Sequence, residues 1–172
     1  MTTTDIATEI SYQLRAETEA DMNFLYDVYA STREEEMQVV PWTQEQKKEF
    51  LQMQFRAQSL HYHKYFGNSS FDIICINDTR IGRLYVERDH AEIRIVDIAL
   101  LPEFRNRGVG TSILEKLKTE ADQKGISLVI HVERNNPAIS LYKRLGFISI
   151  EDKGLYHLME HKSDHGSRQR SA

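Results

Sequence analysis

The chain has 172 residues, of which 40% are hydrophobic and 28% are charged, a composition typical of a globular protein with a single hydrophobic core. Its net charge of -4 and isoelectric point near 6.0 argue against general nucleic-acid binding, which usually requires a basic face. No apolar stretch approaches the roughly 20 residues of a membrane-spanning helix, and the N-terminus does not resemble a signal peptide. We therefore expect a cytoplasmic protein with no membrane partner. A single cysteine, Cys75, excludes an internal disulfide bond.

Hydrophobic periodicity predicts the elements of the N-terminal part. Residues 1–8 are polar, and we expect them to be loose. Apolar and polar residues alternate over residues 10–14, which predicts a half-buried strand, and residues 22–30 have the spacing of an amphipathic helix. Thr43 and Gln46 form a capping-box pattern for a second helix, which we expect to end before residue 61. The side of this helix expected to face the core carries Phe50, Met53, Ala57 and Leu60.

The remainder of the chain alternates between predicted strands and helices. The predicted strands are residues 71–76, 81–87, 92–101, 128–132, 147–150 and 155–159. A helix after the third of them ends at Gly125, a typical C-terminal glycine. Asn136 and Pro137 are typical of the N-cap and first turn of a short helix that ends at Gly146.

This order predicts an α/β (α+β) fold in a single domain over residues 9–161, with a mixed, mostly antiparallel sheet of about six to seven strands and helices on both faces. The strand, helix and strand between residues 92 and 132 should form a right-handed parallel crossover. Its first loop would then lie at the carboxyl end of a strand, where ligands of open sheets bind. Residues 162–172 are polar, and we expect them to form a disordered tail.

The loop from Arg105 to Thr111 is the strongest candidate for a binding site. Gly108 and Gly110 permit close approach of the backbone, and free N–H groups at a helix N-terminus attract phosphate or pyrophosphate. An ordinary tight turn is the alternative interpretation. The motifs for dinucleotides and nucleoside triphosphates do not fit, because position 113 is isoleucine and no Gly-Lys-Ser or Gly-Lys-Thr follows.

Residues 98–147 resemble the GCN5-related N-acetyltransferase (GNAT) family. The run from Ile98 to Pro102, followed by Arg105-x-x-Gly108-x-Gly110, resembles that family's acetyl-CoA-binding signature. The residues that resemble its second conserved block are Asn135, Asn136, Pro137, Ala138, Leu141, Tyr142, Leu145, Gly146 and Phe147. The resemblance implies the GNAT fold and an acyltransferase that uses acetyl-CoA as co-substrate.

By this resemblance, the backbone of Ile98, Ala99 and Leu100 would pair with the pantetheine arm of acetyl-CoA like an additional strand. Asn135 would contact the pantetheine. The neighbouring Asn136 is the better candidate for the N-cap, but because the two asparagines are adjacent, their roles could be exchanged. The residues whose amides would hold the pyrophosphate are Arg105, Asn106, Arg107, Gly108, Val109, Gly110 and Thr111.

Acetyl transfer from a thioester to an amine requires a stabilised oxyanion and a proton for the leaving thiolate. The resemblance places Tyr142 near the sulfur, and its hydroxyl, protonated at neutral pH, would be the catalytic acid. The N–H of Leu100 would stabilise the oxyanion. The other interpretation of Tyr142 is a core aromatic residue on an amphipathic helix.

The base that takes the amine proton is expected on the strand before the glycine loop, where several family members carry a glutamate. That position corresponds to Arg94 here, so the sequence departs from the family pattern. Glu92 and Asp97 are the carboxylates of this strand, and period-2 alternation puts them on opposite faces unless a bulge intervenes. We prefer Asp97 as the catalytic base, because it lies nearer the loop; an ion pair with Arg94 or Arg83 is its other interpretation. Further candidates on the next strand are His131 and Glu133, and several family members use no single base.

Acceptor recognition in the family usually belongs to the first two helices and their connection, here residues 33–42. The glutamates at positions 34–36 would attract a cationic amine; a solvated acidic turn is the alternative. His61 and His63 have no carboxylate or cysteine at ligand spacing, so no metal site is predicted.

We therefore predict an acetyl-CoA-dependent N-acetyltransferase that transfers an acetyl group to a primary amine by direct transfer in a ternary complex, with a small-molecule amine preferred as acceptor. The alternatives are a protein acetyltransferase for lysine or N-terminal amines, a non-catalytic acetyl-CoA-binding module, and an interaction domain whose glycine loop is only a turn. The sequence is compatible with a monomer or a homodimer.

Overall fold

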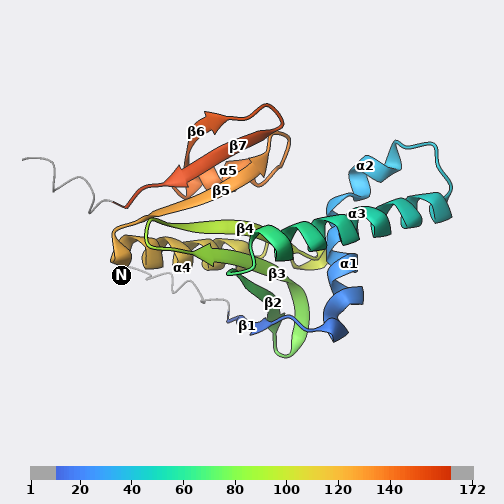
Figure 1. Ribbon diagram of the computed structural model, residues 1–172, viewed down its shortest axis with the longest axis horizontal. Helices are drawn as coiled ribbons and strands as arrows, with labels where there is room; N and C mark the ends of the chain where they lie inside the picture. The colour runs from blue at the N-terminus through green and yellow to red at the C-terminus, as the bar shows by residue number, and fades with distance from the viewer. Residues whose placement is uncertain (1–10, 164–172) are drawn as a thin grey trace, which may run out of the picture.

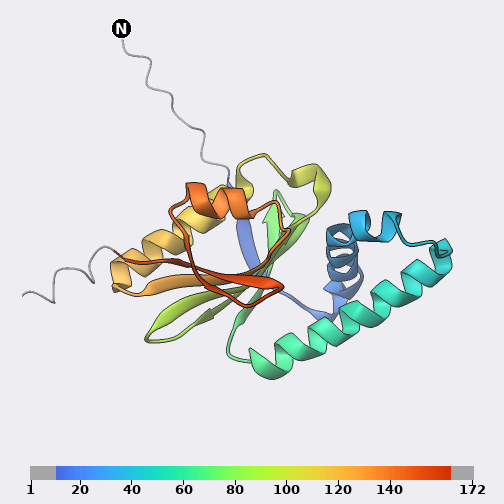
Figure 2. The ribbon, with the colours of Figure 1, turned by 90° about the horizontal axis from the view of Figure 1, so that it is seen from above.

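The computed structural model describes residues 11–163, which form one seven-stranded sheet with helices on both faces (Figures 1 and 2). The strands are β1 (Gln13–Ala16), β2 (Ser70–Ile76), β3 (Thr79–Arg88), β4 (Glu92–Leu100), β5 (Ser127–Glu133), β6 (Ile148–Asp152) and β7 (Tyr156–His161). The helices are α1 (Met22–Thr32), α2 (Glu34–Gln38), α3 (Gln44–Tyr65), α4 (Val109–Lys124) and α5 (Ile139–Arg144), with 3-10 turns at Glu19–Asp21 and Pro102–Phe104. Within this part of the chain, no helix is both long and apolar enough to cross a membrane.

The strand order is β1-β2-β3-β4-β5-β7-β6. β4 and β5 pair in parallel, and the other neighbours in the sheet pair antiparallel. α4 provides the crossover between β4 and β5, because a parallel connection needs a segment long enough to return along the sheet. The predicted single-domain α/β fold with a mixed, mostly antiparallel sheet is therefore confirmed.

Two hydrophobic cores fill the spaces between the sheet and its helical layers (Figure 2). One packs α4 and α5 on the sheet and contains Ile95 and Ile113. The other packs α1 and α3 on the opposite face and contains Val28, Phe55 and Ile73. The glycine loop belongs to the α4 layer, and the predicted acceptor segment belongs to the α1 layer. α2 and the N-terminal half of α3 extend beyond the sheet (Figure 2).

α3 is longer than predicted and buries a different side. It continues to Tyr65, so the predicted end before residue 61 is wrong. Leu51 and Phe55 face the core, whereas the side chains of Met53 and Leu60 are 57% and 73% exposed. The predicted residues and the pair Leu51 and Phe55 both have helical spacing, so spacing alone does not show which side is buried. The position of the sheet determines it. The predicted core-facing side is therefore wrong for Met53 and Leu60, whereas Phe50 packs against the edge of the core.

Smaller differences concern the ends of elements. β1 begins at Gln13 and is exposed along its length, because it is an edge strand, so the predicted half-burial is wrong. α5 begins at Ile139, later than predicted; the side chain of Asn136 accepts a hydrogen bond of 2.9 Å from the backbone N–H two residues ahead and so caps a turn that precedes the helix. The predicted loose N-terminus, residues 1–8, and residues 164–172 of the predicted tail lie outside the described residues.

Candidate active site

β4 and β5 separate toward their carboxyl ends and leave a gap in the middle of the sheet. Their parallel pairing ends at Ile95 and Ile130, whereas β4 continues to Leu100 and β5 to Glu133. Backbone groups that lose their ladder partners in this way need other partners or solvent. The gap is therefore suited to an extended ligand that supplies hydrogen bonds of its own.

The backbone of Ile98 and Leu100 faces this gap. The N–H of Leu101 donates to the carbonyl of Ile81 on β3 at 2.9 Å. Because backbone groups alternate between the two edges of a strand, the N–H and C=O groups of Ile98 and Leu100 point away from β3, toward β5. The carbonyl of Leu100 accepts a hydrogen bond of 2.8 Å from Nε of Arg105. Of the three residues predicted to pair with pantetheine, Ile98 and Leu100 present their backbone to the gap, and Ala99 pairs with β3.

The glycine loop presents several N–H groups at the start of α4. The first intrahelical donor is Ser112, which bonds to the carbonyl of Gly108 at 2.9 Å, so the N–H groups of residues 109–111 have no acceptor within the helix. Gly108 has a left-handed φ of 85°, and Asn106 one of 57°, which turn the chain sharply at the helix N-terminus. Free donors and the helix dipole together favour an anion at this point.

Tyr142, on α5, is buried with 4% of its surface exposed, in the core against which Ile98 and Leu100 pack. Its ring packs edge-to-face on Phe147, with the ring centroids 5.7 Å apart. No hydrogen bond among residues 11–163 involves its hydroxyl group. Burial raises the pKa of Tyr142, and the charge of Asp97 raises it further. Tyr142 packs in the core between the sheet and α5, and Asp97 lies on the opposite face of the sheet, toward α3. Asn135 is exposed in the turn between β5 and α5.

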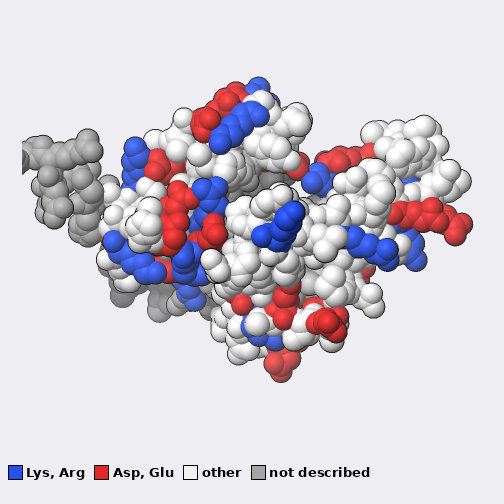
Figure 3. Space-filling model, in the orientation of Figure 1, with Lys and Arg blue, Asp and Glu red and all other residues white. Residues whose placement is uncertain are grey.

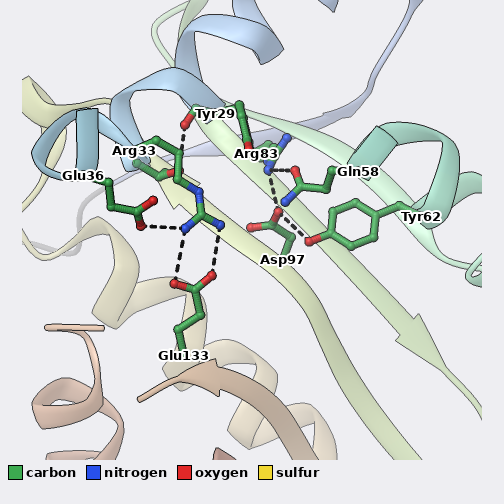
Figure 4. Close-up of polar contacts among 9 residues, drawn as sticks. Tyr29, Arg33, Glu36, Gln58, Tyr62, Arg83, Asp97 and Glu133 are labelled. Carbon is green, nitrogen blue, oxygen red and sulfur yellow. Dashed lines mark hydrogen bonds and ion pairs between the residues drawn. The ribbon is translucent and has the colours of Figure 1, made fainter. Parts of the chain in front are cut away.

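Asp97 belongs to a polar cluster under α3 (Figure 4). Its Oδ2 accepts hydrogen bonds from the guanidinium of Arg83 at 2.6 Å and from the hydroxyl of Tyr62 at 3.2 Å. Arg83 is buried and also donates to Gln58 at 2.8 Å, while its Nε has no partner. Burial raises the pKa of Tyr62, and the nearby Asp97 adds to this effect. The predicted alternative for Asp97, an ion pair with Arg83, is present, and Tyr62 and Gln58 complete the cluster.

A β-bulge decides which face the carboxylates of β4 occupy. The register with β3 shifts between Tyr85 and Val86, so Val96 is an extra residue in β4. Beyond it the alternation of side chains is inverted, and Glu92 and Asp97 lie on the same face, toward α3. Opposite faces are predicted for a regular strand only, and the bulge named as the exception is present.

The other candidate bases also contact arginines. Arg94 pairs with Glu92 and donates to Nδ1 of His131 at 3.3 Å. Burial lowers the pKa of His131, and the charge of Arg94 lowers it further. Glu133, at the end of β5, accepts two hydrogen bonds from Arg33, of 2.9 and 3.3 Å (Figure 4).

Sequence reasoning did not assign Gln58 and Tyr62 to the site. Both lie on the side of α3 that also carries Leu51 and Phe55, and they continue its helical spacing toward the C-terminus. Had that side been chosen as the buried one, a glutamine and a tyrosine at its end would have indicated a polar contact with the sheet. The choice of the wrong helical face hid both residues.

A split between two parallel strands, with a glycine loop and a helix N-terminus at its mouth, is the arrangement of an acyl-CoA-binding domain. Comparison with known families agrees with it: the profile described as Acetyltransferase (GNAT) family matches residues 23–147. The chain belongs to this family, whose enzymes use acetyl-CoA as co-substrate.

Individual relatives share shorter stretches of sequence. The probable N-acetyltransferase san of Drosophila melanogaster is 31% identical over 88 residues, 47% of this chain and 48% of that protein. The N-alpha-acetyltransferase of Sulfurisphaera tokodaii is 36% identical over 61 residues, 33% of this chain and 36% of that protein. The chain thus matches less than half the length of these relatives. Among solved structures, the PaiA N-acetyltransferase of Thermoplasma acidophilum, in complex with coenzyme A, has a TM-score of 0.66 at 19% identity and covers 88% of this chain and 99% of its own. This likeness concerns the fold.

Gly82, opposite Leu100 on β3, permits the close approach of β4 at the gap. A Cβ atom at Gly82 would lie 2.3 Å from the carbonyl oxygen of Ala99 and 2.8 Å from Cδ2 of Leu100. We expect Gly82→Ala to lower the free energy of unfolding by about 1–3 kcal/mol and to weaken acetyl-CoA binding, because β4 must move where it lines the gap. Urea unfolding and calorimetric titration measure the two effects.

Gly110→Ala is the matched control for this prediction. A Cβ atom at Gly110 meets no other atom within 4 Å, and alanine is a good helix former, so we expect the free energy of unfolding to stay within about 1 kcal/mol of the original. Equal stability of the two variants would contradict the steric argument for Gly82.

Proposed function

We propose that the protein transfers the acetyl group of acetyl-CoA directly to a primary amine in a ternary complex. The observation that carries this proposal is the gap between β4 and β5, with the open backbone edge of Leu100 beside it, Tyr142 buried on one face of the sheet and Asp97 on the other. Direct transfer is supported by the position of Cys75, which is buried in the core under α1 and α3 and offers no thiol nucleophile to the gap.

The proposed roles follow from the groups that face the gap. The N–H groups at the start of α4 bind the pyrophosphate, and the backbone of Ile98 and Leu100 binds pantetheine, with Asn135 as a further contact. The N–H of Leu100 stabilises the oxyanion that develops at the thioester carbonyl. Tyr142 donates its proton to the sulfur as the C–S bond breaks, and its raised pKa keeps that proton in place until then.

Asp97 is the proposed base for the acceptor amine. Arg83 and Tyr62 both bind its Oδ2, which fixes the orientation of the carboxylate and leaves Oδ1 for the amine. A cationic amine first releases one proton to solvent and so gains the lone pair that attacks the thioester. The neutral amine loses a second proton as the amide bond forms, and Oδ1 accepts this proton while Tyr142 protonates the leaving thiolate. We propose this role for Asp97 over Glu133, because both oxygens of Glu133 are bound to Arg33.

A small cationic amine is the proposed acceptor. Two carboxylates, Glu36 and Glu133, surround the single guanidinium of Arg33 near the end of the gap, so this group carries a net negative charge. Negative charge at the mouth of a cleft raises the local concentration of cations. A protein N-terminus is the second candidate, since a relative is named N-alpha-acetyltransferase, but that match covers a minor part of the chain.

The test is a thiol-release assay with acetyl-CoA and a panel of diamines, polyamines, amino acids, aminoglycosides and peptides with free N-termini. We expect turnover with diamines or polyamines to exceed that with peptides. Faster turnover of peptides would replace the first candidate by the second. If acetyl-CoA raises the melting temperature, as a ligand of the native state must, and no amine releases thiol, the protein is a non-catalytic acetyl-CoA-binding module and the proposal is wrong.

Asp97→Asn is expected to lower kcat/KM for the acceptor by about 10²-fold, the usual contribution of a general base. The side chain keeps its size and its position beside Arg83, so acetyl-CoA binding should not change. Steady-state kinetics and calorimetric titration measure the two quantities. An unchanged kcat/KM would mean that water or another group takes the proton.

A further inference from the structure

Arg33 connects two parts of the chain that are far apart in sequence. It stands directly after α1, and its guanidinium binds both oxygens of Glu133, at the end of β5, as well as Glu36 on α2, at 2.8 Å (Figure 4). The guanidinium also lies 5.8 Å from the centre of the Tyr29 ring. Glu133 lies beyond the last residue of β5 that pairs with β4, so this ion pair forms where the gap is open.

A second arginine ties the same end of α1 to the other side of the gap. Arg105, the first residue of the glycine loop, donates to the hydroxyl of Ser31 at 3.0 Å and to its carbonyl at 3.4 Å, in addition to its bond with Leu100. Arg105 thus connects the end of α1 to β4 and the glycine loop, and Arg33 connects it to β5. In the space-filling view, acidic and basic side chains meet between α2 and the lobe of β5 to β7 (Figure 3).

We propose that Arg33 and Glu133 are positioning residues for the acceptor. Their ion pair fixes the end of α1, together with α2, across the open end of β5 and so sets the width of the acceptor entrance beside Asp97. A guanidinium bound to a carboxylate through two parallel hydrogen bonds defines an orientation as well as a distance, which a lysine could not. This inference rests on the proposed function.

Charge reversal separates this role from a catalytic role of Glu133. We expect Arg33→Glu and Glu133→Arg each to raise the KM for the acceptor by about tenfold or more, since small displacements of a substrate site are costly and, in Arg33→Glu, outweigh the added attraction for a cation. The Kd of acetyl-CoA should remain within about twofold, because the groups that bind it are retained. The double variant exchanges the two charges and should return the KM to within about threefold of the original. If the double variant stays as impaired as Glu133→Arg, Glu133 acts in the chemistry and the proposal is overturned.

A matched control comes from Arg88 and Glu120, which form an ion pair of similar exposure between β3 and α4, with three hydrogen bonds of 2.9, 3.0 and 3.2 Å. Arg88→Glu should leave the KM for the acceptor unchanged. Hydrogen–deuterium exchange of residues 29–38 gives a readout that needs no turnover: protection should fall in both single charge-reversal variants and recover in the double variant. Unchanged protection in the single variants would overturn the inference by itself. Absence of turnover in the original protein would instead count against the proposed function alone.

Discussion

Replacing Tyr142 by phenylalanine is expected to lower kcat by about 10²-fold, in the range of general acid catalysis, while the Kd of acetyl-CoA stays within about twofold. The hydroxyl group is the only part of the side chain that is lost, and it has no hydrogen bond among residues 11–163, so the packing on Phe147 should be preserved. Single-turnover kinetics measure the chemical step, and calorimetric titration measures binding.

The pH dependence gives a second check on the same residue. Burial and the charge of Asp97 raise the pKa of Tyr142 above the ordinary value of 10.0 for tyrosine, so the hydroxyl remains protonated throughout an assay from pH 6 to 9.5. Deprotonation of Tyr142 should therefore cause no fall in kcat up to pH 9.5. The pH profiles of the original enzyme and of Tyr142→Phe should have the same shape on the alkaline side of this range. If phenylalanine leaves kcat unchanged, the interpretation of Tyr142 as a core aromatic residue is the correct one, and the thiolate takes its proton from solvent.

The part of the site that could be predicted from the sequence is the part built from local geometry. The glycine loop, the helix that it opens and the strand before it follow one another within the stretch from Glu92 to Lys124, and each leaves a local signal: an apolar run, glycines, and helical spacing. The order of these elements also predicts the parallel crossover between β4 and β5, which places the loop at the carboxyl end of β4.

The contacts that link distant segments could not be predicted in the same way. The ion pair between Arg33 and Glu133 joins residues 100 positions apart, and nothing local distinguishes either from an exposed charge. The β-bulge at Val96 leaves no glycine or proline as a signal, yet it decides the face of Asp97. α3 carries apolar residues on two sides. The side with more of them was predicted to face the core, but the sheet packs against the side that carries Leu51 and Phe55.

Asp21→Asn is expected to lower the free energy of unfolding at pH 7 by about 1–3 kcal/mol, the usual cost of losing hydrogen bonds to a buried charged group, since the side chains of Arg15 and Arg80 are 45% and 41% exposed and stay solvated. Asp21 is 1% exposed at the start of α1, and its carboxylate binds Arg15 at 2.7 and 2.8 Å, Arg80 at 3.0 Å and the N–H of Thr18 at 2.9 Å. Asparagine removes the charge that both guanidinium groups require and cannot accept all of these hydrogen bonds. Urea unfolding of the two proteins at pH 7 measures the difference.

The pH dependence identifies the ion pair as the cause of this difference. The hydrogen bonds from Arg15 hold the pKa of Asp21 well below its ordinary value of 3.8. A carboxyl group whose pKa is lower in the folded protein contributes its full stability above the unfolded pKa and loses that contribution as the pH falls toward the folded pKa. The stability difference between the original protein and Asp21→Asn should therefore be constant from pH 7 to about pH 5 and shrink below pH 4.

Glu120→Gln is the control for Asp21→Asn. It breaks a more exposed ion pair, with Arg88, and should change the free energy of unfolding by no more than about 1 kcal/mol. Ser31 and Arg33 lie at the other end of α1. If Asp21→Asn loosens the start of this helix, it should therefore also raise the KM for the acceptor. The stability of α1 and the proposed function are linked in this way.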